Sequence, residues 1–128
     1  MMKPAKLVIV VPCYNEEEVL HETTSQLSAL LDGMEKDGKI SQGNLLYVDD
    51  GSKDATLHNL RKLHAAQKCP VKVISFSRNF GKEAGLFAGL QHASGEYISL
   101  IDADLQQRPE IVRDMVKILD EQPEYDVV

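Results

Sequence analysis

The chain has 128 residues, of which 43% are hydrophobic and 27% are charged, as in an ordinary soluble globular domain. Its formal net charge of -6 argues against a nucleic-acid partner, because binding a phosphate backbone requires a basic face. No apolar run approaches the ~18 residues that cross a bilayer and no signal peptide is recognisable, so we expect one soluble, cytoplasmic domain.

The first half of the chain predicts two strands, each followed by a helix. Residues 6–11 (KLVIVV) form a β-branched run typical of a strand buried on both faces, which Pro12 is expected to end. A helix is expected over residues 16–37, where apolar side chains recur at helical spacing. Residues 45–48 predict the second strand, and a second amphipathic helix carries Leu57, Leu60 and Leu63.

The second half of the chain repeats this alternation. A strand is expected over residues 71–76 and a helix over residues 82–93, in which Gly85 and Gly89 leave a flat face that can sit close to a sheet. Residues 97–101 predict a short buried strand. A last helix is expected to turn its apolar side chains inward, namely Ile111, Val112, Met115, Val116 and Leu119.

Four alternations of strand and helix predict an α/β fold with a doubly wound parallel sheet, right-handed crossovers and helices on both faces. In such sheets ligands bind outside the carboxyl ends of the strands, near the point where the strand order reverses. Polar residues follow each predicted strand, namely Asn15 and Glu16, Asp49 and Asp50, Arg78 and Asn79, and Asp102 and Asp104. These four clusters therefore predict one binding crevice.

The cluster after the fourth predicted strand has the form of a cation site. Side chains at i and i+2 of extended backbone point the same way, so Asp102 and Asp104 present two carboxylates together. Mg²⁺ or Mn²⁺ fits best, because these ions take one or two protein carboxylates and fill the remaining positions with water and phosphate oxygens. The implied ligand is a phosphorylated molecule, although isolated Asp-x-Asp sequences also occur in solvated turns.

Other phosphate-binding designs agree less well with the sequence. No G-x-G-x-x-G follows the first predicted strand, and Gly81-Lys82 lacks the earlier glycine of a P-loop. A phosphatase with an aspartyl nucleophile would carry Asp-x-Asp after the first strand with a threonine behind it, whereas here Leu105 and Gln106 follow the motif after the fourth strand.

Cysteine and histidine placement does not indicate a further metal site. Cys13 and Cys69 lie far apart without a CxxC pattern, so we expect two free thiols rather than a disulfide or a zinc site. The four histidines are expected on helix surfaces, namely His21, His58, His64 and His92.

Four short motifs occur in order along the chain: PCYNE (12–16), VDDGS (48–52), SRNFGKE (77–83) and DADLQ (102–106). Together they resemble the motifs of family 2 glycosyltransferases with the GT-A fold, over residues 7–128. Within that family the polyprenyl-phosphate glycosyltransferases are most similar, a branch that includes dolichol-phosphate mannose synthase and the bactoprenol glucosyltransferases. The resemblance implies a Rossmann-like GT-A nucleotide-binding half.

The resemblance also implies a nucleotide site and a metal site that share the crevice. Tyr14 would lie against the base or ribose, and Glu16 would accept hydrogen bonds from hydroxyl or base N–H groups. Asp50 would accept a hydrogen bond from a ring N–H. The implied nucleotide-binding residues are Pro12, Tyr14, Glu16, Val48, Asp50, Asp102 and Ala103, and the implied metal ligands are Asp102, Asp104 and Gln106.

Three nearby residues keep two interpretations each. Arg78 and Lys82 either contact the phosphates or are ordinary exposed basic residues near a helix start. Asp49 either contacts the ligand or holds the turn made by the Gly-Ser pair that follows.

The implied reaction is metal-dependent transfer of a sugar, with inversion, from a UDP- or GDP-linked nucleotide diphosphate sugar to a polyprenyl (undecaprenyl or dolichyl) phosphate. A lipid phosphate arrives already ionised, which lowers the demand for a strong base, so no general base is assigned. Two alternatives stay open: a nucleotide-sugar-binding module without transferase activity, and a domain that holds a cation structurally.

We expect residues 1–128 to be the donor-binding part of a longer chain, because residues 125–128 (YDVV) begin a β-prone segment directly after a helix. By resemblance, acceptor-side residues and any membrane anchor would follow, which places the whole protein at the cytoplasmic face of a membrane. An unfinished sheet has an open edge, so the chain is expected to pair with itself and to bind nucleotide without transferring sugar.

Overall fold

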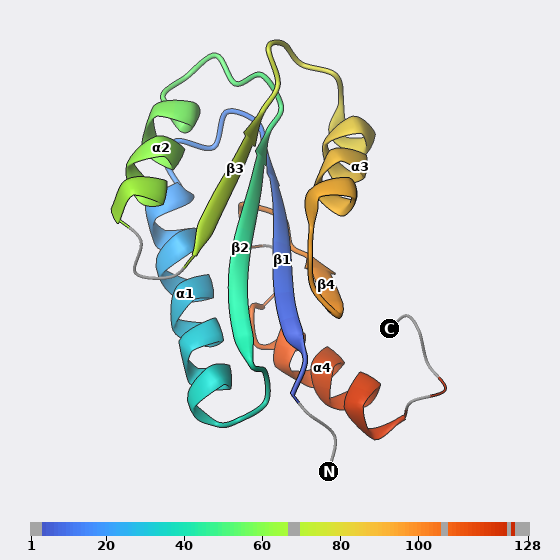
Figure 1. Ribbon diagram of the computed structural model, residues 1–128. Coiled ribbons are helices and arrows are strands. Elements are labelled where there is room, and N and C mark those ends of the chain that lie inside the picture. Colours follow the sequence, from blue (N-terminus) through green and yellow to red (C-terminus); the bar gives the residue numbers. More distant parts are fainter. Residues whose placement is uncertain (1–3, 67–69, 106–107, 123, 125–128) are drawn as a thin grey trace.

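The computed structural model describes residues 4–66, 70–105, 108–122 and 124. Strands and helices alternate along them as the sequence predicts (Figure 1). The elements are β1 (Lys6–Cys13), α1 (Leu20–Lys36), β2 (Gln42–Asp49), α2 (Thr56–Ala66), β3 (Val71–Ser75), α3 (Lys82–His92), β4 (Tyr97–Leu100) and α4 (Ile111–Glu121).

The sheet is parallel and has the order β3-β2-β1-β4. The chain winds outward from β1 to β3 and then crosses to the other side of β1, where β4 pairs with it. Val8, for example, lies beside Asn44 of β2 and Ile98 of β4. The strand order therefore reverses between β1 and β4, which confirms the predicted doubly wound sheet.

Helices cover both faces of the sheet. One face packs with α1, α2 and α4 into the larger core, to which β1 contributes Leu7, Ile9 and Val11. The other face carries the smaller core around Val8 and Val10, and α3 covers it (Figure 1). Because β1 contributes to both cores, its continuous apolar run is buried on both faces, as predicted.

Helix α3 lies close to the sheet through two buried glycines. A Cβ added at Gly89 would come within 2.4 Å of Val10 Cγ1, and one added at Gly85 would lie 3.8 Å from Val48 Cγ1. The prediction of a flat glycine face is therefore confirmed, with Gly89 at the point of closest approach.

Pro12 does not end the first strand, contrary to the prediction, because β1 continues to Cys13. The Val10 carbonyl accepts from the Ile101 N–H, and the Cys13 carbonyl accepts from the Asp50 N–H, so alternate residues of β1 face β4 and β2. Pro12 has the same orientation as Val10 and faces the β4 side. Its missing N–H ends pairing only with β4, while pairing with β2 continues.

The prediction that residues 97–101 form a buried strand is wrong for two of its apolar side chains. Ile98 and Leu100 are 41% and 42% exposed, because β4 is an edge strand and α3 packs on β1 and β2. Ile111 is also 44% exposed rather than inward. In α4 the buried side chains are Val112 and Val116.

The first helix begins at Leu20, four residues later than predicted, and the preceding residues form a turn. The Glu16 carbonyl accepts from the N–H groups of Val19 and Leu20, which closes that turn. The segment after β1 is therefore a loop at the sheet edge. No helix in the described residues is long and apolar enough to cross a membrane.

Candidate functional site

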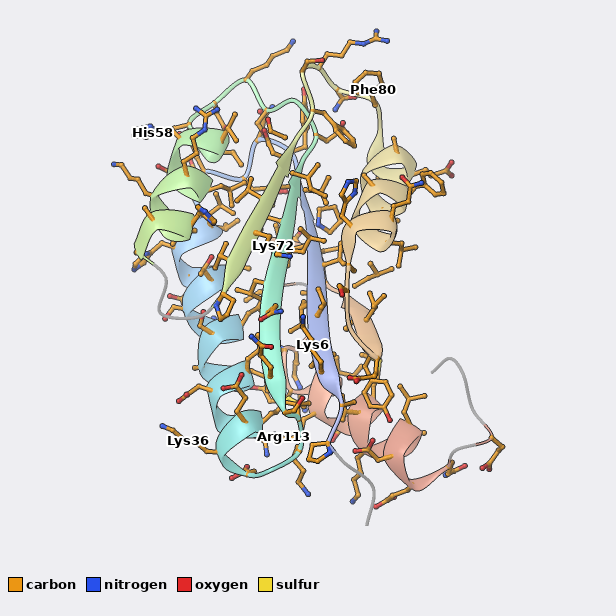
Figure 2. The ribbon with its side chains drawn as sticks, viewed as in Figure 1. Lys6, Lys36, His58, Lys72, Phe80 and Arg113 are labelled. Atoms are coloured by element: carbon orange, nitrogen blue, oxygen red, sulfur yellow. The ribbon has the colours of Figure 1, made fainter. Side chains whose placement is uncertain are left out.

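A cavity of about 480 Å³ opens at the carboxyl ends of the strands. Its walls come from the segments that follow all four strands, which is where the sequence predicts a crevice. The lining residues are Pro12, Cys13, Tyr14, Glu16, Asp50, Asn79, Gly81, Lys82, Gly85, Asp102, Ala103 and Asp104. In Figure 2, Phe80 marks this end of the molecule, and Lys36 and Arg113 mark the opposite end.

The structure places two of the predicted site residues away from the cavity lining and does not describe a third. Val48 has no exposed surface and packs beneath α3, so its side chain supports the helix instead of lining the cavity. The Arg78 guanidinium lies over the Phe80 ring, 4.5 Å from its centre, and Arg78 is not among the lining residues. Gln106 lies outside the described residues.

Three of the lining residues had no site role predicted from the sequence, namely Cys13, Gly81 and Gly85, whereas Asn79 belongs to one of the predicted polar clusters. Cys13 and Gly81 lie within the PCYNE and SRNFGKE motifs, so their position in the chain was a usable signal. Gly85 was predicted to face the sheet, and it also borders the cavity because α3 begins at the cavity rim.

The loop after β1 is hydrogen-bonded to the loop after β2. Asn15 adopts a positive φ of 52°, a conformation that asparagine tolerates better than most residues. Its N–H donates to Ser52 Oγ over 2.9 Å, and its Oδ1 accepts from the Lys53 N–H over 2.8 Å. The Glu16 N–H donates to Thr56 Oγ1 over 2.8 Å. These contacts position the segment that carries Tyr14 and Glu16 on the cavity wall.

Adjacent carboxylates Asp49 and Asp50 have different partners. Asp49 is 1% exposed, accepts from Ser52 Oγ over 2.5 Å and does not line the cavity, which agrees with the turn-holding interpretation. Asp50 lines the cavity although it is only 5% exposed. Its carboxylate accepts from the N–H groups of Phe80 and Gly81, over 2.7 and 3.0 Å, and from the Asn79 amide over 3.1 Å.

The cavity holds a concentration of negative charge. Burial raises the pKa of Glu16, and the nearby charges of Asp104, Asp54 and Asp102 raise it further. One lysine opposes this charge, because Lys82 Nζ lies 3.2 Å from Asp102 Oδ1. Carboxylates gathered in this way favour a bound cation, which relieves their repulsion.

Asp102 and Asp104 fit the Mg²⁺ or Mn²⁺ site that the sequence predicts. Both line the cavity, and they supply the hard oxygen donors that these ions prefer. The described residues contain no group of three or more histidine, cysteine or acidic side chains arranged to hold a metal. Two carboxylates are nevertheless the usual protein share for such ions, whose other ligands are water and phosphate oxygens.

The Cys13 thiol is buried at the cavity wall and is free, as predicted for this residue. It donates a hydrogen bond to the Val11 carbonyl over 3.6 Å. Burial raises its pKa, and the charges of Glu16 and Asp49 raise it further, so the thiol stays protonated and is a poor nucleophile. Cys69 lies outside the described residues, and the four histidines are exposed as expected.

Comparison with known proteins agrees with this geometry. The family model for glycosyl transferase family 2 matches residues 8–128. The chain belongs to this family. The motifs that line the cavity are thus carried by a glycosyltransferase sequence, and the sheet places them where α/β folds bind ligands.

Similar curated proteins are also glycosyltransferases. The chain is 42% identical over 117 residues to the uncharacterized glycosyltransferase YkcC of Bacillus subtilis. The matched segment covers 91% of this chain and 34% of YkcC. The chain is 38% identical over 115 residues to the bactoprenol glucosyl transferase of Shigella phage SfV, covering 88% of this chain and 34% of that protein. The chain therefore spans about a third of the length of these relatives.

Solved structures share the fold of this family 2 glycosyltransferase chain. Staphylococcus aureus TarS 1-349 in complex with UDP-GlcNAc superimposes with a TM-score of 0.70 at 27% identity, over 92% of this chain and 32% of the TarS 1-349 chain. The mannosyltransferase PcManGT of Pyrobaculum calidifontis, in complex with GDP-Man and Mn²⁺, gives a TM-score of 0.74 at 24% identity, over 91% of this chain and 32% of that one. Both confirm the Rossmann-like GT-A architecture.

Proposed function

We propose that the cavity binds a UDP- or GDP-linked nucleotide diphosphate sugar and that this chain is the donor-binding part of an inverting glycosyltransferase. The observation that carries the proposal is the convergence of Glu16, Lys82, Asp102 and Asp104 on one cavity at the carboxyl ends of the strands. A similar structure, TarS, has been solved with UDP-GlcNAc at 27% identity, which supports a nucleotide sugar as the ligand.

The donor lies across the cavity with its base near the β1 loop and its diphosphate near Asp102. Tyr14 is 40% exposed at the cavity wall and offers a ring for the base or ribose, while Pro12 and Ala103 supply apolar surface beside it. Glu16 accepts hydrogen bonds from hydroxyl or base N–H groups. Lys82 is the basic side chain closest to the diphosphate, because it already lies beside Asp102.

In the proposed enzyme Asp102 and Asp104 hold Mg²⁺ or Mn²⁺, with Gln106 as a further ligand implied by the family motif. The ion supplies Lewis-acid stabilisation of the departing diphosphate. The protein's own contribution is to gather negative side chains that bind the ion and to orient the donor so that its anomeric carbon faces the acceptor.

We propose a polyprenyl phosphate as acceptor of the whole protein, which would then work at the cytoplasmic face of a membrane. The 38% identity to a bactoprenol glucosyl transferase supports this acceptor class. A phosphate monoester is already ionised near neutral pH, so the attacking oxygen needs little help from a base, and none of the cavity carboxylates is assigned that role.

Calorimetry of this chain with UDP and with GDP, first in Mn²⁺ and then in EDTA, tests the donor site. We expect affinity to fall about tenfold or more in EDTA, because the carboxylates repel a diphosphate unless a cation bridges them. Asp104→Asn should remove most of the metal-dependent part of the affinity for the nucleoside diphosphate. Asp114→Asn, the same change on α4 outside the cavity, should leave it intact. Equal affinities in Mn²⁺ and EDTA would contradict the metal assignment.

A transfer assay with nucleotide sugar and polyprenyl phosphate separates the remaining alternatives. We expect this chain to bind nucleotide without transferring sugar, since it spans about a third of the length of its relatives. Turnover by this chain would show that it is more than a donor-binding part. Failure of the full-length protein to transfer sugar would favour the non-catalytic binding module. A metal affinity that does not change when nucleotide is added would favour a cation with a structural role.

A further inference from the structure

We propose that the groove between α2 and β3 is a docking site for an extended acidic segment of a partner protein, which pairs with β3 as an added strand. The groove lies at the sheet edge opposite β4. It shares no lining residue with the nucleotide cavity, so the two sites can be tested separately.

Strand β3 has open hydrogen-bonding groups along its outer side. In the described residues it pairs only with β2. The Phe76 N–H donates to the Asp49 carbonyl, and hydrogen bonds along a strand alternate between its two sides. The N–H and C=O groups of Val73 and Ser75 therefore point away from β2, where another strand could pair with them.

A groove of about 280 Å³ runs beside these groups, with α2 as its other wall (Figure 1). Leu57 and Val73 give it apolar surface, and Arg61 and His64 of α2 supply polar groups. His64 Nδ1 donates to the Val71 carbonyl, which ties the helix to the start of the strand. An extended peptide that adds to an edge strand gains main-chain hydrogen bonds and places alternate side chains in such a groove.

The surface around the groove is basic although the chain as a whole is acidic. None of the 20 acidic residues lies between residues 55 and 82, the segment that contains α2 and β3. Arg61 and Lys62 of α2 and Lys72 of β3 are all exposed. Lys72 lies on the same side of β3 as Ile74, which packs on the smaller core, and so on the face opposite the groove. An added strand with apolar residues toward the groove and acidic residues toward Lys72 would match both faces.

Other occupants fit this edge less well. A second copy paired through its own β3 would bring the basic side chains of the two copies together, and a lysine on an edge strand disfavours such pairing. An anionic membrane surface would attract Lys72 and Arg61 but would supply no backbone groups to Val73 and Ser75. An acidic extended peptide meets the charge, the open backbone and the apolar groove together.

Calorimetry with a short blocked peptide of alternating glutamate and valine tests the docking site. The matched control is the same peptide with lysine in place of glutamate. We expect the acidic peptide to bind this chain at least about tenfold more tightly than the basic one, because only the acidic side chains meet opposite charge. Equal affinity for the two peptides, or no binding of the acidic one, would overturn the proposal.

Hydrogen exchange locates the bound peptide. At a protein concentration where sedimentation shows a monomer, saturating acidic peptide should slow amide exchange in β3 about tenfold or more, because the N–H groups of Val73 and Ser75 gain partners. Strand β4, at the other edge of the sheet, is the internal control and should exchange at an unchanged rate. Slowing in β4 alone, or equally in both strands, would contradict a specific site at β3.

Two pairs of variants separate the charge from the backbone contribution. Lys72→Glu should weaken binding of the acidic peptide about tenfold, whereas Lys117→Glu, the same change on α4, should alter it less than about twofold. Ser75→Pro removes an outward N–H and should weaken binding about fivefold, whereas Ser75→Ala keeps that N–H and should not. Thermal unfolding shows whether each variant is folded, and the lysine pair decides the question if Ser75→Pro unfolds. Unchanged affinity in Lys72→Glu would refute the proposal.

The alternative occupants give distinct results. Phosphatidylglycerol vesicles that bind the wild type but not Lys72→Glu, with no binding of the acidic peptide, would make a membrane the occupant and overturn the proposal. Self-association that Ser75→Pro abolishes and Ser75→Ala retains would do so in favour of a second copy. Lys72→Glu should leave the affinity for UDP and GDP in Mn²⁺ unchanged, because Lys72 does not line the nucleotide cavity. Peptide binding by a chain that binds neither nucleotide would refute the proposed function and support the docking site.

Discussion

Glu16 shows how a carboxylate on the cavity wall can lower the stability of the folded chain. Its carboxylate lies on the wall of a cavity that also carries Asp102 and Asp104, and its backbone N–H is held by Thr56 Oγ1. Burial, followed by the charges of Asp104, Asp54 and Asp102, raises its pKa from an ordinary value of 4.5. The ionised form is therefore less favourable in the folded chain than in the unfolded chain.

Glu16→Gln should raise Tm by about 2 °C near pH 7 in the absence of metal, because it removes a charge that the fold disfavours. The folded-state pKa lies above the unfolded one, so the folded wild type takes up a proton more readily as pH falls. The advantage of the variant should accordingly be full above the raised pKa and shrink as pH falls toward 4.5.

Thermal unfolding from about pH 4 to about pH 8 measures this difference, because that window runs from the ordinary pKa of a glutamate to neutral pH. Glu18→Gln is the matched control, since Glu18 is an exposed glutamate in the same loop and its replacement should leave Tm unchanged. A Glu16→Gln advantage that stays constant with pH would show that the carboxylate charge is not the cause.

At the scale of elements, α3 connects the smaller core to the site. Its sheet-facing side is made flat by Gly85 and Gly89, so the helix lies against β1 and β2. The same helix begins at the cavity rim, with Lys82 in its first turn. The depth at which α3 sits on the sheet therefore also determines where the start of the helix stands relative to Asp102.

Gly89→Ala should destabilise the chain by about 1–3 kcal/mol, because its Cβ would come within 2.4 Å of Val10 Cγ1 and force the helix outward. Gly85→Ala is the matched control in the same helix. Its Cβ would meet Val48 Cγ1 at an ordinary 3.8 Å, and alanine favours helix by about 1 kcal/mol over glycine. In urea unfolding, the free energy of unfolding should therefore fall for Gly89→Ala and rise for Gly85→Ala. Equal changes in the two variants would contradict the close approach of Gly89 to the sheet.

At the scale of the whole molecule, one sheet edge combines open backbone with apolar side chains. In the described residues β4 pairs only with β1, and Ile98 and Leu100 are more than two-fifths exposed. Phe87 and Leu90 of α3 are exposed as well. Edge strands of this kind tend to pair with another chain.

We therefore expect this chain to self-associate with rising concentration, as sedimentation velocity would show. Leu100→Lys should reduce that association, because a lysine on an edge strand disfavours pairing. Ile111→Lys makes the same change at a side chain of similar exposure on α4, away from the edge, and should have little effect. A chain that stays monomeric at high concentration would contradict the expectation.

The sequence alone was enough to predict the order and type of the elements and the sheet edge on which the cavity lies. The β-branched run of β1 and the helical spacing of the apolar residues in α1 are local signals, because burial imposes a period that can be read along the chain. The polar residues after each strand are equally local, and parallel strands necessarily bring their carboxyl ends to one edge.

The neighbours that those residues contact depend on the tertiary structure. Pro12 continues its strand because β2 still pairs with it where β4 has diverged, and Ile98 is exposed because α3 covers other strands. Asp50 is bound by a loop about thirty residues away in sequence, so its partners depend on how β3 places that loop beside β2. The residue type shows whether a side chain needs burial or hydrogen-bond partners. Strand order and helix packing determine which groups lie near enough to provide them.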